Sequence, residues 1–195
     1  HLSKPGLILT WLLAALGAPT ALVGLLVPIR EAGSLVPQMV ISQWLRRYEI
    51  RRGFWVVGSA LQGVAILGMG FVALFLTGAM AGWCIIGLLV LFSLSRGICS
   101  ITGKDLLGKT IPKTKRGRLT GIASSISGWV AVAVGIFFAL NPASELPVEL
   151  FATLLFVAGA LWIFAASVMS TLIEEPSETT KEGNPFLDAL ASLKL

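Results

Sequence analysis

The chain has 195 residues, of which 55% are apolar and only 13% charged, and its mean hydropathy is +0.86. These values exclude an ordinary soluble domain and indicate an integral membrane protein. The net charge of +5 is collected in short basic runs between long uncharged stretches, so it reports on membrane topology. We therefore expect no nucleic-acid partner, because such a partner needs a basic face on a folded soluble domain.

The hydropathy pattern predicts an all-α fold with six transmembrane helices. The second helix is the shortest. Its uncharged part, Ser34 to Leu45, would be only about 18 Å long as a helix, and the segment from Arg30 to Arg47 is needed to reach about 27 Å. Pro19 is expected to kink the first helix by freeing the carbonyl of Ala15. The expected spans are residues 5–28, 31–47, 53–76, 82–102, 119–140 and 148–173.

After the last span, residues 174–195 form a second region, predicted to be a cytoplasmic linker. Asn184 and Pro185 are typical of the start of a helix, and the apolar residues that follow share one face. We expect an amphipathic helix to begin there and to pack on a membrane surface or on a neighbouring helix.

Basic residues follow the second and fourth predicted helices, whereas the connections after the third and fifth helices contain none. Because two crossings separate the two clusters, both lie on one side, which the positive-inside rule identifies as the cytoplasm. Six spans then place both termini in the cytoplasm. The cations are Arg46, Arg47, Arg51 and Arg52 in the first cluster and Lys104, Lys109, Lys113, Lys115, Arg116 and Arg118 in the second.

The stretch "GKDLLGKT", Gly103 to Thr110, satisfies the phosphate-binding pattern G-x-x-x-x-G-K-[ST]. A true P-loop lies between a buried strand and a helix, but a long apolar helix precedes this stretch. We therefore expect no nucleotide to bind, and we interpret the stretch as part of a short cytoplasmic connector. Cys84 and Cys99 lie fifteen residues apart in apolar stretches and are expected to be packing residues. No metal, no cofactor and no enzymatic activity are expected.

Two stretches, "VPIREAGSLVPQ" and "SRGICSITGKDLLGKTIPKTKRGRLTG", resemble bacterial permeases of the major facilitator superfamily (MFS). The resemblance implies that the chain is the N-terminal six-helix half of a twelve-helix transporter in the bacterial inner membrane. Its partners would then be the lipid bilayer, a small-molecule substrate and the missing C-terminal half. The two halves would move about a site near the membrane midplane.

The motifs of the superfamily are only partly present. "WLRRYEIRR" keeps the basic pair Arg51 and Arg52, but Arg47 stands where the motif has its acid. The fourth helix keeps the arginine of R-x-x-Q-G as Arg96, followed by Cys99 and Ser100 in place of Gln and Gly. The G-P step of the antiporter motif is absent from the fifth helix.

Four residues are candidates for substrate binding or ion coupling: Arg96, Glu31, Arg30 and Gln38. Arg96 would either clamp an anionic group or tune the proton affinity of a carboxylate; the alternative is an arginine that extends to the lipid headgroups. Glu31, placed at the outer junction of the first two helices, is either a proton or cation site or an interfacial salt bridge with Arg30. For Gln38 and Gln62 the alternative role is a hydrogen bond to a neighbouring helix.

The cytoplasmic gate candidates are Asp105, Arg116, Arg118, Arg51 and Arg52. We expect Asp105 to pair with Arg116 or Arg118 as a latch in one state of a transport cycle.

Small residues at steps of three and four in the fifth helix, among them Gly121, Gly128 and Gly135, predict close packing against another helix.

The sequence thus favours a secondary transporter of a small solute, coupled to an ion gradient because no ATPase machinery is visible. A non-transporting membrane scaffold and a lipid flippase of the same fold remain alternatives.

Overall fold

The computed structural model describes residues 8–45, 48–141, 146–174 and 176. These residues form helices and connections, and no strand occurs within the described ranges. The helices are α1 (Ile8–Ala15), α2 (Thr20–Leu45), α3 (Arg52–Phe75), α4 (Gly78–Thr110), α5 (Lys113–Leu140) and α6 (Val148–Ser170). The expected amphipathic helix after Asn184 lies outside the described residues.

Four of the described helices are long and apolar enough to cross a membrane, namely α3, α4, α5 and α6. Their bounds lie close to the predicted third to sixth spans, although α4 and α5 extend further into the basic segment between them. α4 continues to Thr110, and only Ile111 and Pro112 separate it from α5. The extended backbone of Ile111 is the conformation favoured before a proline, and it ends α4.

The first two helices begin and end at other residues than we expected. The chain turns back after α1, and α2 runs without interruption through Pro28, Arg30 and Glu31. Gly17 adopts a left-handed φ of 69°, its N–H donates to the Ala14 carbonyl, and the Ala18 N–H donates to the Leu13 carbonyl. This is a Schellman ending followed by a proline, so Pro19 separates two helices where we expected it to kink one. The expected break between residues 28 and 31 was therefore wrong.

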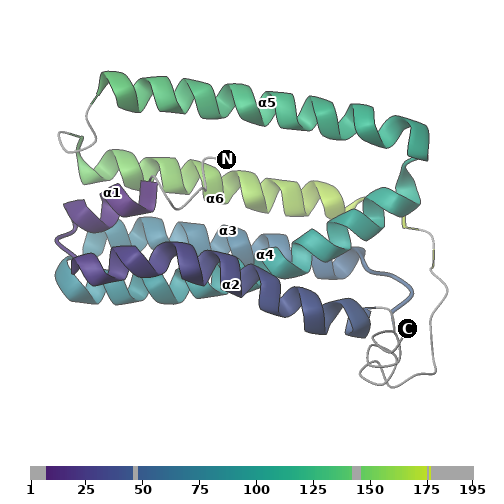
Figure 1. The fold of residues 1–195 in the computed structure, drawn as a ribbon, viewed down its shortest axis with the longest axis horizontal. Helices are drawn as coiled ribbons and strands as arrows, with labels where there is room; N and C mark the ends of the chain where they lie inside the picture. Colours follow the sequence, from purple (N-terminus) through teal and green to yellow (C-terminus); the bar gives the residue numbers. More distant parts are fainter. Residues whose placement is uncertain (1–7, 46–47, 142–145, 175, 177–195) are drawn as a thin grey trace, which may run out of the picture.

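The long helices run alternately along one axis, so their ends gather at two ends of the bundle (Figure 1). α2, α4 and α6 finish, and α3 and α5 begin, at the end shown on the right; we call this the basic end because it carries Arg51, Arg52 and Lys109. At the opposite end, the Gly78 N–H donates to the Leu16 carbonyl at 2.7 Å and joins the α3–α4 turn to the α1–α2 turn.

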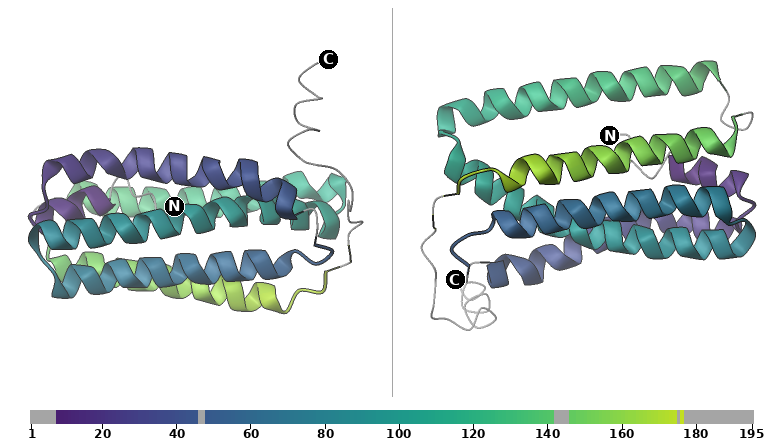
Figure 2. Two further views of the ribbon diagram at one scale, coloured as in Figure 1. Left: turned by 90° about the horizontal axis from the view of Figure 1, so that it is seen from below. Right: turned by 180° about the vertical axis from the view of Figure 1, so that it is seen from behind.

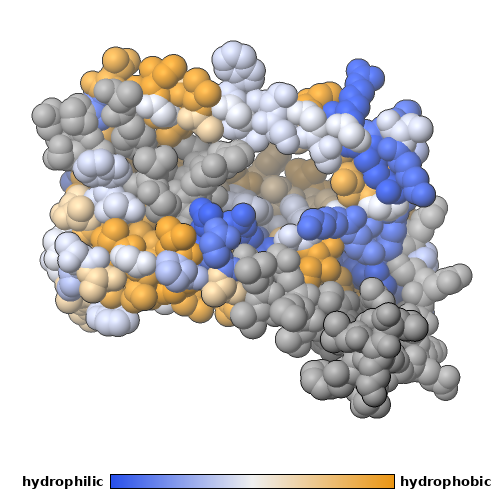
Figure 3. Space-filling model, viewed as in Figure 1, coloured by the Kyte–Doolittle hydropathy of each residue, from blue (hydrophilic) through white to orange (hydrophobic). Residues whose placement is uncertain are grey.

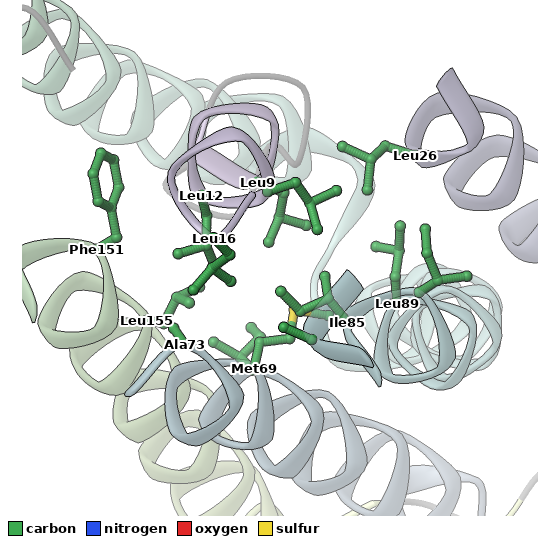
Figure 4. Close-up of a cluster of buried hydrophobic side chains, with 14 of the residues drawn as sticks. Leu9, Leu12, Leu16, Leu26, Met69, Ala73, Ile85, Leu89, Phe151 and Leu155 are labelled. Carbon is green, nitrogen blue, oxygen red and sulfur yellow. The ribbon is translucent and has the colours of Figure 1, made fainter. Parts of the chain in front are cut away.

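The apolar core lies between α1, α2, α3, α4 and α6 (Figure 4). α3 packs against α6 and α4, α4 packs against α2, and α1 covers the core near the opposite end. Leu12 and Ile85 are completely buried there. Glycines permit the closest approach: a Cβ on Gly63 of α3 would lie 3.1 Å from the Gly159 carbonyl of α6.

α5 lies apart from this core, as Figure 1 and the right-hand view of Figure 2 show. None of its described side chains is buried. A Cβ on Gly121, Gly128 or Gly135 would meet no atom within 4 Å. These glycines of the predicted small-residue stripe therefore pack against no other described helix, and the close helix contacts are made by glycines of the other helices.

Candidate functional site

A cluster of charged residues lies where α2 crosses α4. The crossing is close, because a Cβ on Gly33 would lie 2.7 Å from the Cβ of Ser93. Arg30 and Glu31 are within one turn of Gly33 on α2, and Arg96 lies three residues after Ser93 on α4. Residues three apart share a helix face. The crossing therefore brings together Arg30, Glu31 and Arg96, which we call the mid-bundle cluster.

The carboxylate of Glu31 is the centre of the mid-bundle cluster. Arg30 Nε donates to Glu31 Oε1 at 2.9 Å, and Arg30 Nη2 donates to the same oxygen. Arg96 lies near enough for its charge to act on the same carboxylate. The Arg30 and Glu31 side chains are 21% and 53% exposed, and Arg96 is exposed, so the cluster is open to one side of the bundle.

The cluster lies far from the ends of α2 and from the basic end of α4. Arg96 lies eight residues before Lys104, which is about 12 Å along α4, in a hydrocarbon layer of about 30 Å. Arg30 and Glu31 occupy the middle of α2, not the outer membrane junction where we expected them. The reason is the early turn at Gly17, which makes one helix of the two segments. Figure 3 shows a hydrophilic area at mid-length on this face, apart from the larger one at the basic end.

The remaining candidate on α2, Gln38, is helical, but its side chain lies outside the described residues. Gln62 of α3 is completely buried, and its Nε2 donates to Cys99 Sγ at 3.2 Å. The Ser59 hydroxyl lies 3.5 Å from the same sulfur. These contacts form a polar link between α3 and α4, with Cys99 as a buried packing residue. Within the described ranges, no three His, Cys, Asp or Glu side chains are placed to hold a metal ion.

A second charged cluster joins three segments at the basic end. Arg51 Nη1 lies 2.8 Å from Asp105 Oδ1, and Lys109 Nζ lies 3.2 Å from Asp105 Oδ2. Lys109 Nζ also lies 2.6 Å from Glu174 Oε1. Two cations thus meet two carboxylates from the α2–α3 connection, α4 and the segment after α6. We call Arg51, Asp105, Lys109 and Glu174 the basic-end network.

Glu174 holds the start of α3. Its Oε2 accepts hydrogen bonds from the backbone N–H groups of Arg51, at 2.9 Å, and Arg52, at 2.6 Å. These groups are at the beginning of α3, where no preceding turn supplies acceptors and where the helix dipole favours a negative charge. The Arg52 guanidinium donates to the Leu172 carbonyl, which fixes the same two segments a second time. The Glu174 side chain is completely buried.

In this structure Asp105 does not pair with Arg116 or Arg118, the latch that we expected in one state of a transport cycle. Arg116 binds backbone carbonyls at the end of α4, with Nε donating to Ile111 at 2.8 Å and Nη2 to Gly108 at 2.5 Å. Cations near a helix C-terminus satisfy carbonyls that lack intrahelical donors. Asp105 lies earlier on α4 and pairs with Arg51 and Lys109 instead, and Arg118 forms no ion pair with any described residue.

The stretch Gly103 to Thr110 is helical throughout and forms the last turns of α4. The expected connector is therefore part of a helix, and its N–H groups donate to carbonyls of α4. The strand, loop and helix that a P-loop requires are not the local structure at this position.

Sequence reasoning missed Glu174, which we had placed in a featureless polar linker. A signal was present: Glu174 directly follows the sixth span on the side where the cations gather, so a carboxylate there has partners available. From the sequence, Lys109 indicates only the membrane topology. Its second role depends on α4 continuing past residue 102, which brings Asp105 and Lys109 into the i, i+4 relation.

Comparison of the chain with known protein families, curated proteins and solved structures finds no match. The two charged clusters and the helices that carry them are therefore the basis for a functional proposal.

Proposed function

We propose that the chain is part of a secondary active transporter, similar to the N-terminal half of an MFS permease, that moves a small solute by alternating access. The mid-bundle cluster is the observation that carries this proposal. Charged groups inside a transmembrane segment are costly, at least about 2.5 kcal/mol each, and they typically mark substrate or ion pathways. Arg30, Glu31 and Arg96 are the only charged residues of α2 and of the α4 segment 78–103.

Alternating access needs, besides a binding site, a contact that closes one end of the bundle and can open. The basic-end network is suited to be that contact. It joins the exits of α2, α4 and α6 through side chains, and side-chain ion pairs can break without unfolding the helices. In the proposed cycle these contacts close the basic end in one state and separate in the other. Arg51 and Asp105 are then the gate residues in place of Asp105 with Arg116 or Arg118.

The proposed location is the bacterial inner membrane, with the basic end in the cytoplasm. The positive-inside rule supports this orientation, because Arg51, Arg52 and Lys109 lie at one end. It also puts the segment after α6 in the cytoplasm; the expectation that both termini lie there requires one further crossing before α2, which the eight-residue α1 is too short to make. A second six-helix half would complete the transporter, and the exposed α5 offers it a surface. Ion-gradient coupling remains part of the proposal.

The test is Arg96→Ala in the full-length protein, reconstituted in vesicles with a solute found by thermal-stabilisation screening. We expect transport to be lost while membrane insertion and the amount of folded protein stay unchanged. Lys115→Ala, which removes an exposed cation at the basic end, is the matched control and should transport normally. Transport at the wild-type rate by Arg96→Ala would contradict the proposed role of the mid-bundle cluster.

A further inference from the structure

The charges of the mid-bundle cluster do not balance. Arg30 pairs directly with the Glu31 carboxylate, and Arg96 lies near enough for its charge to act on the same group, so two cations and one anion leave a formal charge of +1. No other charged residue of α2 or of the α4 segment 78–103 can compensate it, since the sequence contains none there. At this depth in a membrane an uncompensated cation is unfavourable, so the cluster is suited to a negative partner.

The contacts show which cation lacks that partner. Arg30 directs both Nε and Nη2 to Glu31 and is engaged by it. Arg96, in contrast, forms no direct hydrogen bond or ion pair with a described residue, and its side chain is exposed. A guanidinium presents parallel N–H donors that match the two oxygens of a carboxylate. On the same face of α4, the completely buried Ser93 hydroxyl also has no hydrogen-bond partner among the described residues.

We propose that the mid-bundle cluster binds a singly charged anionic solute, such as a small carboxylate, with the anion on Arg96. This inference rests on the proposed transport function and names the class of its substrate. Glu31 then limits the charge that the site accepts, because it neutralises Arg30 and leaves one positive charge for the solute.

The experiment measures ligand-induced thermal stabilisation of the full-length protein in phosphatidylcholine nanodiscs. The probes are acetate, lactate and benzoate, each compared with its neutral amide of nearly the same shape. We expect at least one acid to stabilise the protein and its amide to have no effect. Arg96→Gln should weaken the binding of that acid about tenfold to a hundredfold, the loss typical of one charge-assisted hydrogen bond.

Glu31→Gln is the discriminating variant. It raises the formal charge of the cluster from +1 to +2 and frees Arg30, so acid binding should become tighter and a dianion such as succinate should now bind. In the double variant Glu31→Gln with Arg96→Gln, the charge returns to +1, and we expect acid binding to recover at least tenfold relative to Arg96→Gln alone. A merely structural effect of Arg96→Gln would not be rescued by a second substitution.

The outcomes separate this inference from the transport proposal. The anion site would be overturned, and transport left intact, if each amide stabilised the protein and crossed the vesicle membrane to the same extent as its acid. Acids that bind without exchanging would support the anion site and overturn transport. Failure of every acid to stabilise the protein would overturn the anion site. If phosphatidylglycerol in the nanodiscs stabilises the protein and the acids do not, the anion is a lipid headgroup and the solute proposal is wrong.

Discussion

Replacing Glu174 by alanine removes three contacts from one buried carboxylate. Its Oε2 loses the N–H groups of Arg51 and Arg52, at 2.9 and 2.6 Å, and its Oε1 loses Lys109, at 2.6 Å. Each hydrogen bond to a charged group contributes about 1.5 to 3 kcal/mol, but such terms are not additive when the freed groups regain water. Removal of one partner from a buried ion pair typically costs about 3 to 5 kcal/mol. We therefore expect the equilibrium constant for opening this end of α3 to rise by a factor between about a hundred and a few thousand.

The thiol of Cys99 provides the assay. It is only 8% exposed, and it contacts the Trp55 carbonyl in the first turn of α3, so separation of this turn from α4 uncovers it. In a Cys84→Ala background, the rate of labelling by a thiol-reactive dye in detergent follows the population of the open form when opening and closing are fast. Glu174→Ala should accelerate labelling by the factor given above. Glu174→Gln, which keeps an acceptor oxygen for the N–H groups, should have an intermediate effect.

Glu49→Ala is the matched control, because Glu49 is an exposed glutamate in the α2–α3 connection, close in sequence to the N–H groups that Glu174 accepts from. Its labelling rate should stay within about twofold of the parent protein, since surface substitutions change stability by less than about 0.5 kcal/mol. If Glu174→Ala labels as slowly as Glu49→Ala, the carboxylate does not hold the start of α3 and the reasoning is wrong.

Three further predictions concern single positions. Gly63→Ala should lower the free energy of unfolding in detergent by about 1 to 3 kcal/mol, because the new Cβ would lie 3.1 Å from the Gly159 carbonyl of α6. Gly128→Ala should not destabilise the protein, because its Cβ would meet no atom within 4 Å. Gly17→Ala should lower the thermal midpoint because φ is 69° there, at a cost of about 1 to 2 kcal/mol, whereas Gly24→Ala, in an open position of α2, should raise it. Asp105→Asn should raise the rate of solute transport measured without an ion gradient. It should also make the basic end more accessible, as measured by cysteine labelling. Unchanged transport kinetics would remove Asp105 from the gate.

The sequence allowed the helical class and four of the membrane-length helices to be predicted, because their apolar stretches are long and end at charged or proline-containing segments. The ends of α4 and α5 were less predictable. Charged residues are usual signs of a membrane boundary but not of a helix end, and α4 continues through Lys104, Asp105 and Lys109 until Pro112 imposes an extended residue before it. Because the predicted span ends at residue 102, the sequence analysis did not place Asp105 and Lys109 on one helix.

The first two helices were predicted incorrectly for a reason that the sequence contains. "LGAP" has a glycine followed within two residues by a proline, which is typical of a helix end. Hydropathy alone favoured a break at the charged pair Arg30 and Glu31, and that preference placed the pair at a membrane surface. The mid-bundle cluster could not be predicted from there, because Arg96 lies more than sixty residues after Glu31 and only the α2–α4 crossing brings the two close together.

The cap of α3 by Glu174 has a consequence for the order in which the molecule is made. α3 begins at Arg52 and its cap arrives 122 residues later, so the ribosome must synthesise α4, α5 and α6 before the first N–H groups of α3 meet their acceptor. Until then the first N–H groups of α3 depend on water for their acceptors. A residue just after α6 therefore completes the start of α3, and Glu174 can pair with Lys109 only when α6 has been made.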